Sequence, residues 1–345
     1  MFSRERTAVG LDIGASSVKV VEVERRGPEP RIVHFGEAAL EPDVIVDGEI
    51  MDRQMLVAAI RDLFETHRIE SRHVVLGVHG RGVIVKKILV DKVDPAAADQ
   101  VVFGEAEQHV AYDIDDVALD YQILDPERGD KMQVLLVAAK RDLILSRVEI
   151  IREAGLAVDA VDVNCFALQN SLEQSEKLGP EETVALLNVG ADITNVNVVR
   201  GGVPLYTQDL SLGSHSYLQS VQKAFRLSRA EAEKALQEKP CRLDVQPLLE
   251  QFCADLSGSL EKSLNYLRTA GDADHLDRVL VCGGGAQIEG VVELLARRQS
   301  APVTLADPLR GIACGRGVFP DGAPGAVAPR LAVGLGLALR KERAK

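Results

Sequence analysis

The sequence predicts an α/β protein, because short β-rich runs alternate with segments of helical periodicity along the whole chain. Two strand–turn–strand patterns lie about 176 residues apart, which is a weak internal duplication. The length of 345 residues corresponds to roughly two domains. Together these observations favour two related α/β halves within one chain.

The chain opens with the first of the two strand–turn–strand patterns. Residues 8–13 and 18–23 are β-rich apolar runs, and the small residues 14–17 between them predict a tight turn, so this segment reads as a β-hairpin. A third strand is expected at 31–35, after a Gly/Pro turn signal. Apolar residues then recur at helical spacing over 55–64, which predicts an amphipathic helix.

The middle of the chain continues the alternation. Strands are expected at 74–78, 83–90 and 134–138, and helices at 99–111 and 143–151. Gly155 follows the last of these helices, as a C-terminal capping glycine does. Residues 79–162 therefore look like a self-contained strand–helix–strand–helix unit.

The second strand–turn–strand pattern repeats the layout of the first. Residues 184–189 form an apolar run, 190–194 form a short turn, and 197–199 begin the return strand. The remainder is rich in helix, with elements expected at 248–267 (a long helix), 279–282 (a strand that ends in three glycines) and 288–298 (a helix).

Composition excludes several classes of protein. The formal net charge of −12 is opposite to that of a nucleic-acid binder, whose footprint is a basic face. The five cysteines show no C-x-x-C pairing, which is typical of reduced thiols in a reducing compartment. The longest apolar stretch, 331–339, is far shorter than the roughly 20 residues of a membrane span. We therefore expect a cytoplasmic protein that neither binds nucleic acid nor inserts into a membrane.

Three glycine turns, each at the end of a strand, are the candidate sites of chemistry. Glycine lets the backbone approach an anion closely and point N–H groups at it. The sequence contains neither a Walker A motif nor G-x-G-x-x-G, so a bound nucleotide is held neither by a P-loop nor by a Rossmann turn. Two facing hairpins could instead clamp a polyphosphate, with Asp12 on the Mg²⁺ side and Lys19 on the phosphate side.

The ordered motifs resemble those of the actin-like ATPases. LDIGASSVK resembles their phosphate-1 motif, LNVGADIT their phosphate-2 motif and VLVCGGGAQIEG their adenosine motif, while APRLAVGLGLALR resembles their second connecting helix. The order and the surrounding stretches are similar to those of the PilM family of type IV pilus assembly proteins, to which FtsA is related in architecture.

This resemblance implies an α/β, two-lobed actin-like ATPase fold with an FtsA-like inserted subdomain. Lobe one would comprise residues 1–78, 163–181 and 329–345. The inserted subdomain would be 79–162, and lobe two 182–328.

The resemblance also implies ATP and Mg²⁺ as cofactors in a cleft between the lobes. Residues that would contact phosphates or the Mg²⁺ waters are Asp12, Gly14, Ser16, Ser17 and Lys19, with Asp12 holding Mg²⁺ through water. The opposing phosphate loop would consist of Gly190, Ala191, Asp192 and Thr194, opened by Asn188. Beneath the adenosine would pass Gly283, Gly284 and Gly285. Glu233 would reach the ribose, or else be a solvated helix charge.

Two positions depart from the pattern of an active ATPase. Asn188 stands where the phosphate-2 motif usually has Asp, and Asn164 stands about where relatives carry a water-orienting Glu or Gln. An amide can hydrogen-bond a water but cannot take its proton. We therefore expect ATP binding with slow or absent hydrolysis, and the sequence assigns no catalytic residue.

The function implied by the resemblance is that of an ATP-binding cytoplasmic scaffold of the type IV pilus inner-membrane platform, with a role in twitching motility. A groove between lobe one and the inserted subdomain would take the N-terminal cytoplasmic peptide of PilN. Other platform proteins and the membrane would be reached through PilN, and head-to-tail self-association is left open. The alternatives are an FtsA-like filament protein and a carbohydrate kinase of the same superfold.

Overall fold

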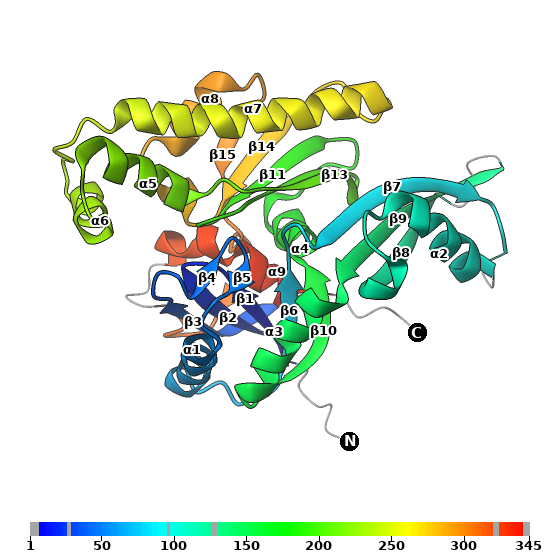
Figure 1. Ribbon diagram of the computed structural model, residues 1–345, viewed down its shortest axis with the longest axis horizontal. Helices are drawn as coiled ribbons and strands as arrows, with labels where there is room; N and C mark the ends of the chain where they lie inside the picture. Colours follow the sequence, from blue (N-terminus) through cyan, green and yellow to red (C-terminus); the bar gives the residue numbers. More distant parts are fainter. Residues whose placement is uncertain (1–6, 26–28, 95–96, 126–129, 320–323, 341–345) are drawn as a thin grey trace.

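The computed structural model describes five stretches of the chain, which are residues 7–25, 29–94, 97–125, 130–319 and 324–340. The outermost residues of the predicted first lobe, 1–6 and 341–345, lie outside these stretches. Within them the protein is built on two large sheets with helices between and around them, plus a smaller unit to one side (Figure 1). The α/β class and the two-lobed architecture are confirmed.

The first sheet contains the first predicted hairpin at its centre. Its strand order is β10 (Ala157–Val163), β6 (His73–Val78), β1 (Thr7–Ile13), β2 (Ser17–Glu24), β3 (Arg31–Ala39) and β16 (Ala313–Cys314). The small pair β4 (Ile45–Val46) and β5 (Glu49–Ile50) follows β3. Helices α1 (Arg53–Thr66) and α3 (Arg141–Glu153) share one core with β1, β2 and β6. Burial of the apolar stripes on both helices fixes this layer.

The second sheet repeats the arrangement around the second hairpin. Its strand order is β13 (Val203–Leu210), β12 (Thr194–Arg200), β11 (Thr183–Val189), β14 (Arg278–Cys282) and β15 (Val303–Leu305). Four helices accompany this sheet: α5 (Ser214–Phe225), α6 (Arg229–Gln237), α7 (Gln246–Ala270) and α8 (Val291–Arg298). Residues of all four join the core on one face of the sheet. The long helix α7 runs across the top of this lobe (Figure 1).

Two helices lie between the sheets and connect the lobes: α4 (Asn164–Glu176) and α9 (Ala332–Ala338) (Figure 1). Leu168 and Leu172 of α4 pack on the second sheet, whereas α9 packs on β1 and β2 of the first. A Cβ at Gly10 would collide with the carbonyl oxygen of Gly334, so glycines on β1 and α9 let the two backbones touch.

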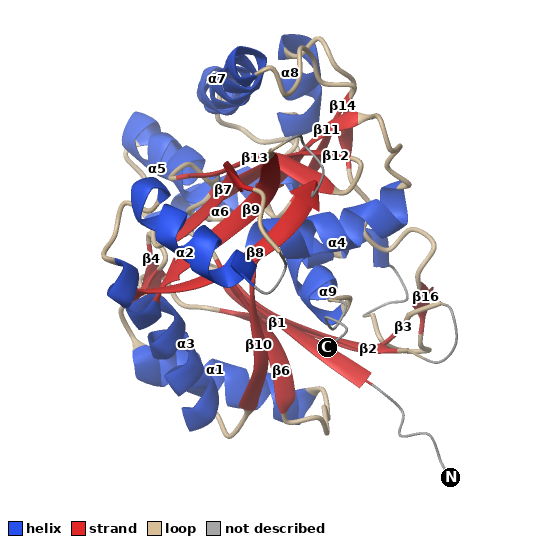
Figure 2. Cartoon of the chain, turned by 90° about the vertical axis from the view of Figure 1, so that its right-hand side faces the viewer, coloured by secondary structure: helices blue, strands red, loops and turns tan. Residues whose placement is uncertain are grey.

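The smaller unit is a three-stranded sheet whose order is β7 (Val83–Asp91), β9 (Lys131–Lys140) and β8 (Val117–Asp125). Helix α2 (Ala98–His109) shares a core with this sheet. The unit lies to one side of the two lobes in Figure 1 and therefore in front of them in Figure 2. The expected strand–helix–strand–helix composition of this unit is wrong. Strand β8 was not expected, although the apolar residues Val117, Leu119, Tyr121 and Ile123 alternate along it, as they do in a half-buried strand.

Two boundaries of the predicted domains also shift. Helix α3 and strand β10 belong to the first sheet, because Ile150 and Ile151 pack in its core and β10 pairs with β6. Late in the chain, β16 pairs with β3, and Phe319 packs on Phe35 with ring centroids 5.3 Å apart. We therefore propose that the inserted unit ends near residue 140 rather than 162, and the second lobe near 306 rather than 328.

The helices of the described chain include none with both the length and the apolar character that a bilayer crossing requires. The longest of them, α7, buries a leucine-rich stripe in the second lobe and exposes polar residues elsewhere. Its length therefore reflects packing along the sheet.

Candidate functional site

A pocket of about 290 Å³ lies between the lobes, where the turns of the two hairpins face each other. Its wall includes most of the residues expected from sequence, namely Asp12, Gly14, Ser16, Ser17, Lys19, Asn188, Gly190, Ala191, Asp192, Gly283 and Gly284. Segments far apart in the chain thus converge on one cavity, as the facing-hairpin hypothesis requires.

The two hairpins share the same register. Asp12 lies opposite Lys19 in the first, and Asn188 lies opposite Asn195 at the matching position of the second. The turns also match: the amide of Gly14 donates to the carbonyl of Ser17 at 3.0 Å, and that of Gly190 donates to the carbonyl of Ile193 at 3.0 Å. The weak duplication in the sequence is therefore a close structural repeat.

The matching positions differ in charge. In the first hairpin the Lys19 Nζ atom lies 3.5 Å from Oδ2 of Asp12, and both residues are buried. In the second hairpin the amide of Asn188 donates to Oδ1 of Asn195 at 3.0 Å, and Asn195 in turn donates to Asp209 at 2.6 Å. One side of the pocket thus offers a charged pair and the other a neutral amide pair.

Asp192 anchors the second turn to its surroundings. Its carboxylate accepts hydrogen bonds from Nδ1 of His215 at 2.7 Å and from the backbone amide of Asp47, in the other lobe, at 3.1 Å. Burial alone would raise the pKa of Asp192, but the hydrogen bond from His215 is the main influence against it, and the pKa is lowered. Arg229 extends the chain of contacts, since it lies 2.9 Å from His215 Nε2 and 2.9 Å from Glu233.

Three residues expected at the ligand do not line the pocket. The hydroxyl of Thr194 donates to the carbonyl of Leu212 at 2.6 Å, and Gly285 is packed against Val189. Glu233 pairs with Arg229 on α6, at the outer end of the contacts that start from Asp192.

Other residues reach the pocket that the sequence did not single out for it, namely Glu37, His79, Arg147, Gln287 and Arg330. Arg147 left a detectable signal. It lies three and four positions before the buried Ile150 and Ile151, so a charge interrupts the buried face of α3. His79 directly follows β6, where the end of a buried strand opens onto the cleft.

Three side chains in the pocket wall have unsatisfied polar atoms, and one of these atoms is Nε of Arg330. His79 Nδ1 and Asn164 Oδ1 are buried and have no hydrogen-bond partner in the structure. Burial lowers the pKa of His79, against the opposing charge of Asp209, so the ring is held neutral. Buried polar atoms without partners are rare in proteins, and here they indicate a polar ligand or ordered water.

The pocket fits a metal that arrives with the ligand. Among the described residues there is no cluster of three or more His, Cys, Asp or Glu side chains that could hold a metal ion. Mg²⁺ commonly keeps several waters and takes one or two carboxylates plus phosphate oxygens. The carboxylate of Asp12 beside two glycine turns suits that mode of binding.

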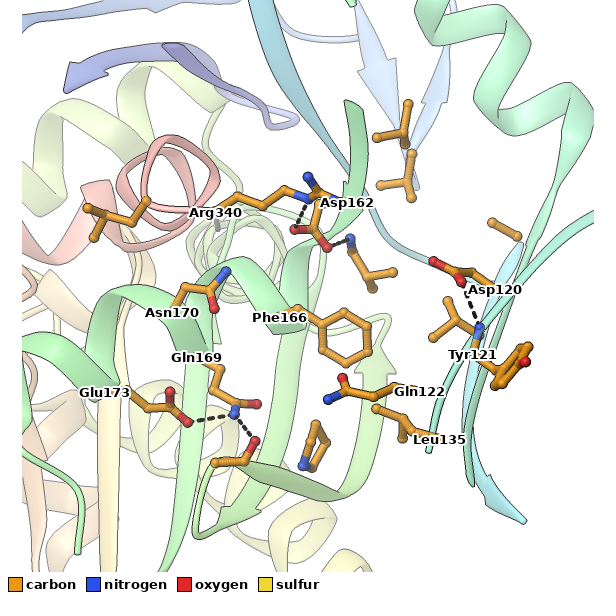
Figure 3. Close-up of a pocket in the computed structure, with 18 of the residues that line it drawn as sticks. Asp120, Tyr121, Gln122, Leu135, Asp162, Phe166, Gln169, Asn170, Glu173 and Arg340 are labelled. Atoms are coloured by element: carbon orange, nitrogen blue, oxygen red, sulfur yellow. Dashed lines mark hydrogen bonds and ion pairs between the residues drawn. The ribbon is translucent and has the colours of Figure 1, made fainter. Parts of the chain in front are cut away.

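A larger cavity of about 930 Å³ lies where the small unit meets the first lobe (Figure 3). Leu135, Val137 and Ala139 alternate along β9 and point to it, while the intervening residues of β9 face α2. Phe166 of α4 reaches into the middle of the cavity (Figure 3). We refer to this cavity as the groove, and its floor is apolar.

Polar groups border the groove on two sides. Asp162 lies 3.2 Å from Nε of Arg340, and burial raises its pKa although Val163 N–H and Arg340 counteract this. On α4, the amide of Gln169 donates to Glu173 at 2.6 Å and to the carbonyl of Gly202 at 2.7 Å (Figure 3). An apolar floor with polar borders suits a short peptide better than a small polar metabolite.

The pocket and the groove share a wall. Val78 lines the groove and its neighbour His79 lines the pocket, at the end of β6. At the end of β10, Val163 lines the groove and Asn164 the pocket. Residues that line the two cavities are therefore neighbours in the chain at the ends of two adjacent strands.

The sequence profile of the family described as "Type IV pilus assembly protein PilM" matches residues 10–342. Among solved structures, a PilM–PilN type IV pilus biogenesis complex contains a chain that is 27% identical. The match covers 96% of this chain and 97% of that one, with a TM-score of 0.85.

More distant similarities support the fold. The cell division protein FtsA of Bacillus subtilis is 25% identical over 256 residues, which is 66% of this chain but only 56% of FtsA. FtsA of Streptococcus pneumoniae gives a similar match, so the chain spans about half the length of these curated relatives. MreB5 of Spiroplasma citri, solved with bound ADP, has a TM-score of 0.54 at 12% identity, which indicates a shared fold alone.

Proposed function

We propose, because the chain belongs to the PilM family of type IV pilus assembly proteins, that it is an ATP-binding scaffold of the pilus assembly platform. Its partner is the N-terminal cytoplasmic peptide of PilN, which binds in the groove. One observation carries this proposal: the groove of about 930 Å³ opens at the junction of the inserted unit and the first lobe. The similarity of the whole chain to a protein solved in a PilM–PilN complex supports it.

The groove is suited to an extended peptide with apolar side chains. Burying apolar side chains on Leu135, Val137 and Phe166 removes area from water, worth about 25 cal/mol per Å² before ordering costs. Charged groups at the border, such as Arg340 and Glu173, would fix the direction and register of the peptide.

ATP with Mg²⁺ occupies the pocket between the lobes in this proposal. The backbone amides of the two glycine turns and the ammonium of Lys19 bind phosphate oxygens, and Asp12 holds a Mg²⁺-bound water. The metal, when bound, neutralises phosphate charge. A ligand that contacts both lobes stabilises the arrangement in which both sets of contacts are made.

Hydrolysis is slow or absent in this proposal. Asn188 and Asn164 hydrogen-bond but do not take protons, and Asp12 already faces Lys19. The nucleotide therefore acts as a structural ligand, and its binding adds about 2.7 kcal/mol of stability at a hundredfold excess over its dissociation constant.

The proposed location is the cytoplasmic face of the inner membrane. The protein reaches the membrane, and other platform proteins, through PilN. In this role it contributes to pilus assembly and twitching motility.

The peptide site is tested by calorimetry with a synthetic PilN N-terminal peptide, with and without ATP. Val137→Asp places a charge on the groove floor and should weaken binding at least tenfold, or about 1.4 kcal/mol. Gln133→Asp on the same strand lies outside the groove and should change affinity less than about twofold. No binding by the wild type in either condition would refute the scaffold role.

An FtsA-like filament protein is the second candidate, favoured by the sequence similarity to FtsA over two thirds of the chain. Sedimentation with ATP distinguishes the two. A scaffold stays in the supernatant at micromolar concentration, and a filament protein pellets. No observation favours the carbohydrate kinase.

A further inference from the structure

Arg147 is a buried guanidinium that faces the pocket. It projects from α3, is 4% exposed, and lines the cavity between the lobes. Its Nη2 atom donates to the carbonyl of Gly48 at 3.1 Å. Among the residues that the structure describes, no carboxylate lies within 4 Å of it, so its charge is left uncompensated.

The other two long cations in the pocket wall are each paired. Lys19 lies 3.5 Å from Asp12, and Arg330 lies 3.1 Å from Glu37. Burial is the main influence on Arg147 and lowers its pKa, opposed by the charge of the exposed Glu49. Because a buried charge without a counter-ion is costly, the pocket around Arg147 is incomplete without an anion.

A second observation points to a ligand at the same place. His79 Nδ1 and Asn164 Oδ1 have no partner and line the same cavity as Arg147, whose charge is felt by His79. A guanidinium, a neutral imidazole and an amide oxygen suit a phosphate group with its bound water. The guanidinium binds phosphate oxygens, and the amide oxygen accepts from the water.

The position of Arg147 selects which phosphate it meets. Arg330 lies near Gly284, at the end of the pocket expected to hold the adenosine. Arg147 instead contacts Gly48, where an added Cβ would lie 3.8 Å from Ile193 in the second phosphate turn. Arg147 therefore stands at the phosphate turns, away from the adenosine end.

We propose that Arg147 binds the terminal phosphate of a nucleoside triphosphate and makes the pocket prefer the triphosphate to the diphosphate. This inference rests on the proposed nucleotide site and deepens it. The planar guanidinium engages two phosphate oxygens at once, which a lysine does not reproduce. In the diphosphate complex Arg147 lacks its counter-ion, and the difference appears as selectivity.

The experiment is calorimetry of the full chain with Mg²⁺ and either AMPPNP or ADP. The variants are Arg147→Met, Arg147→Lys and the control Arg152→Met, an exposed position on the same helix. We expect Arg147→Met to lower the affinity for AMPPNP at least tenfold and that for ADP less than twofold. Arg147→Lys falls between, and Arg152→Met matches the wild type. Thermal unfolding without nucleotide should show Arg147→Met no less stable than the wild type, because an uncompensated charge is removed.

Two results would overturn the role of Arg147 and leave the proposed nucleotide site standing. One is a wild type that binds both nucleotides while Arg147→Met keeps the same AMPPNP/ADP ratio. The other is an equal loss for both nucleotides with a lowered melting temperature, because Arg147 would then only hold Gly48 in place. If the wild type binds neither nucleotide, the nucleotide half of the proposed function fails together with the inference.

Discussion

The two hairpins that face each other across the pocket have the same backbone and different side chains. Asp12 and Lys19 form a buried charged pair in the first, and Asn188 and Asn195 form a neutral hydrogen-bonded pair at the matching register positions of the second. Backbone N–H groups can hold phosphate in either turn. The duplication therefore preserves the pocket-facing backbone, while only the first hairpin has a charged pair at these register positions.

The turns also differ in how strictly they need glycine. A Cβ added at Gly14 would lie 3.3 Å from the carbonyl oxygen of Ser17, which a small shift relieves. At Gly190 it would lie 2.7 Å from the carbonyl oxygen of Ile193, which is too close for any side chain. The second turn is the tighter, and it carries Asp192 where the first has Ser16.

Breaking the charged pair should have the largest effect on stability. Lys19→Met leaves the buried Asp12 without its counter-ion and should lower the free energy of unfolding by about 3 kcal/mol without nucleotide. In the second hairpin, Asn195→Ala removes the amide–amide bond with Asn188 and the bond donated to Asp209, and should cost about 1.5 kcal/mol. Urea unfolding measures both.

The double variant Asp12→Leu/Lys19→Met serves as the control. With both charges gone it should return to within about 1 kcal/mol of the wild type, because no lone charge remains buried. Equal losses from Lys19→Met and Asn195→Ala would contradict the asymmetry between the hairpins.

A carboxylate at position 188, to match Asp12 of the first hairpin, should raise the rate of ATP hydrolysis. We expect the wild type to turn over ATP more slowly than about 0.1 s⁻¹, well under ordinary enzymes. Asn188→Asp adds a carboxylate on the metal side, where unit charges about 4 Å apart interact by on the order of 4 kcal/mol. Turnover should rise about tenfold, which corresponds to about 1.4 kcal/mol.

Phosphate release under saturating Mg²⁺-ATP measures this change, with Asn188→Ser as the uncharged control. The control should remain at the wild-type rate. A fast wild type, or equal rates for the two variants, would show that a missing carboxylate at position 188 does not limit hydrolysis.

Sequence patterns predicted the parts of the site that are encoded locally. The Asp12–Lys19 hairpin and the Asn188 turn are short runs in which strand, glycine and polar residue follow one another, and their convergence on one pocket follows from the duplication. Thr194 was placed at the ligand because it lies in the same run, yet strand alternation turns its hydroxyl to a backbone carbonyl.

The remaining parts depend on contacts between distant segments. Arg147 reaches the pocket because α3 packs on the first sheet. The sequence patterns had assigned this helix to the inserted subdomain. The groove combines β8, β9, β10 and α4 with Arg340 from the end of the described chain, and no local pattern relates them. A charge on an apolar helix face was the one available signal, and it predicts burial without saying what the charge faces.

His79 lies between the two hairpins and offers the smallest test of their difference. Burial is the main cause that lowers its pKa, opposed first by Asp209. Asp12 of the first hairpin and Asp192 of the second also oppose it, whereas Arg147 reinforces it. In the unfolded chain the ring takes a proton near pH 6.5, while the folded state keeps it neutral. The stability that depends on the neutral ring is therefore complete above pH 6.5 and is lost as the pH falls toward the folded pKa.

Between pH 7.5 and 5.5 the wild type should lose about 1 kcal/mol more free energy of unfolding than His79→Gln, which has no proton to take up. Urea unfolding at the two pH values gives this difference. Lys19→Met should reduce the excess loss, because the freed charge of Asp12 then helps the ring to protonate from the first hairpin alone. Asn195→Ala, which changes no charge, should leave the excess loss as it is. Lys19→Met and Asn195→Ala could instead change this excess loss of unfolding free energy equally. The side chains of the two hairpins would then act on His79 in the same way, and the distinction between a charged and a neutral pair would not hold.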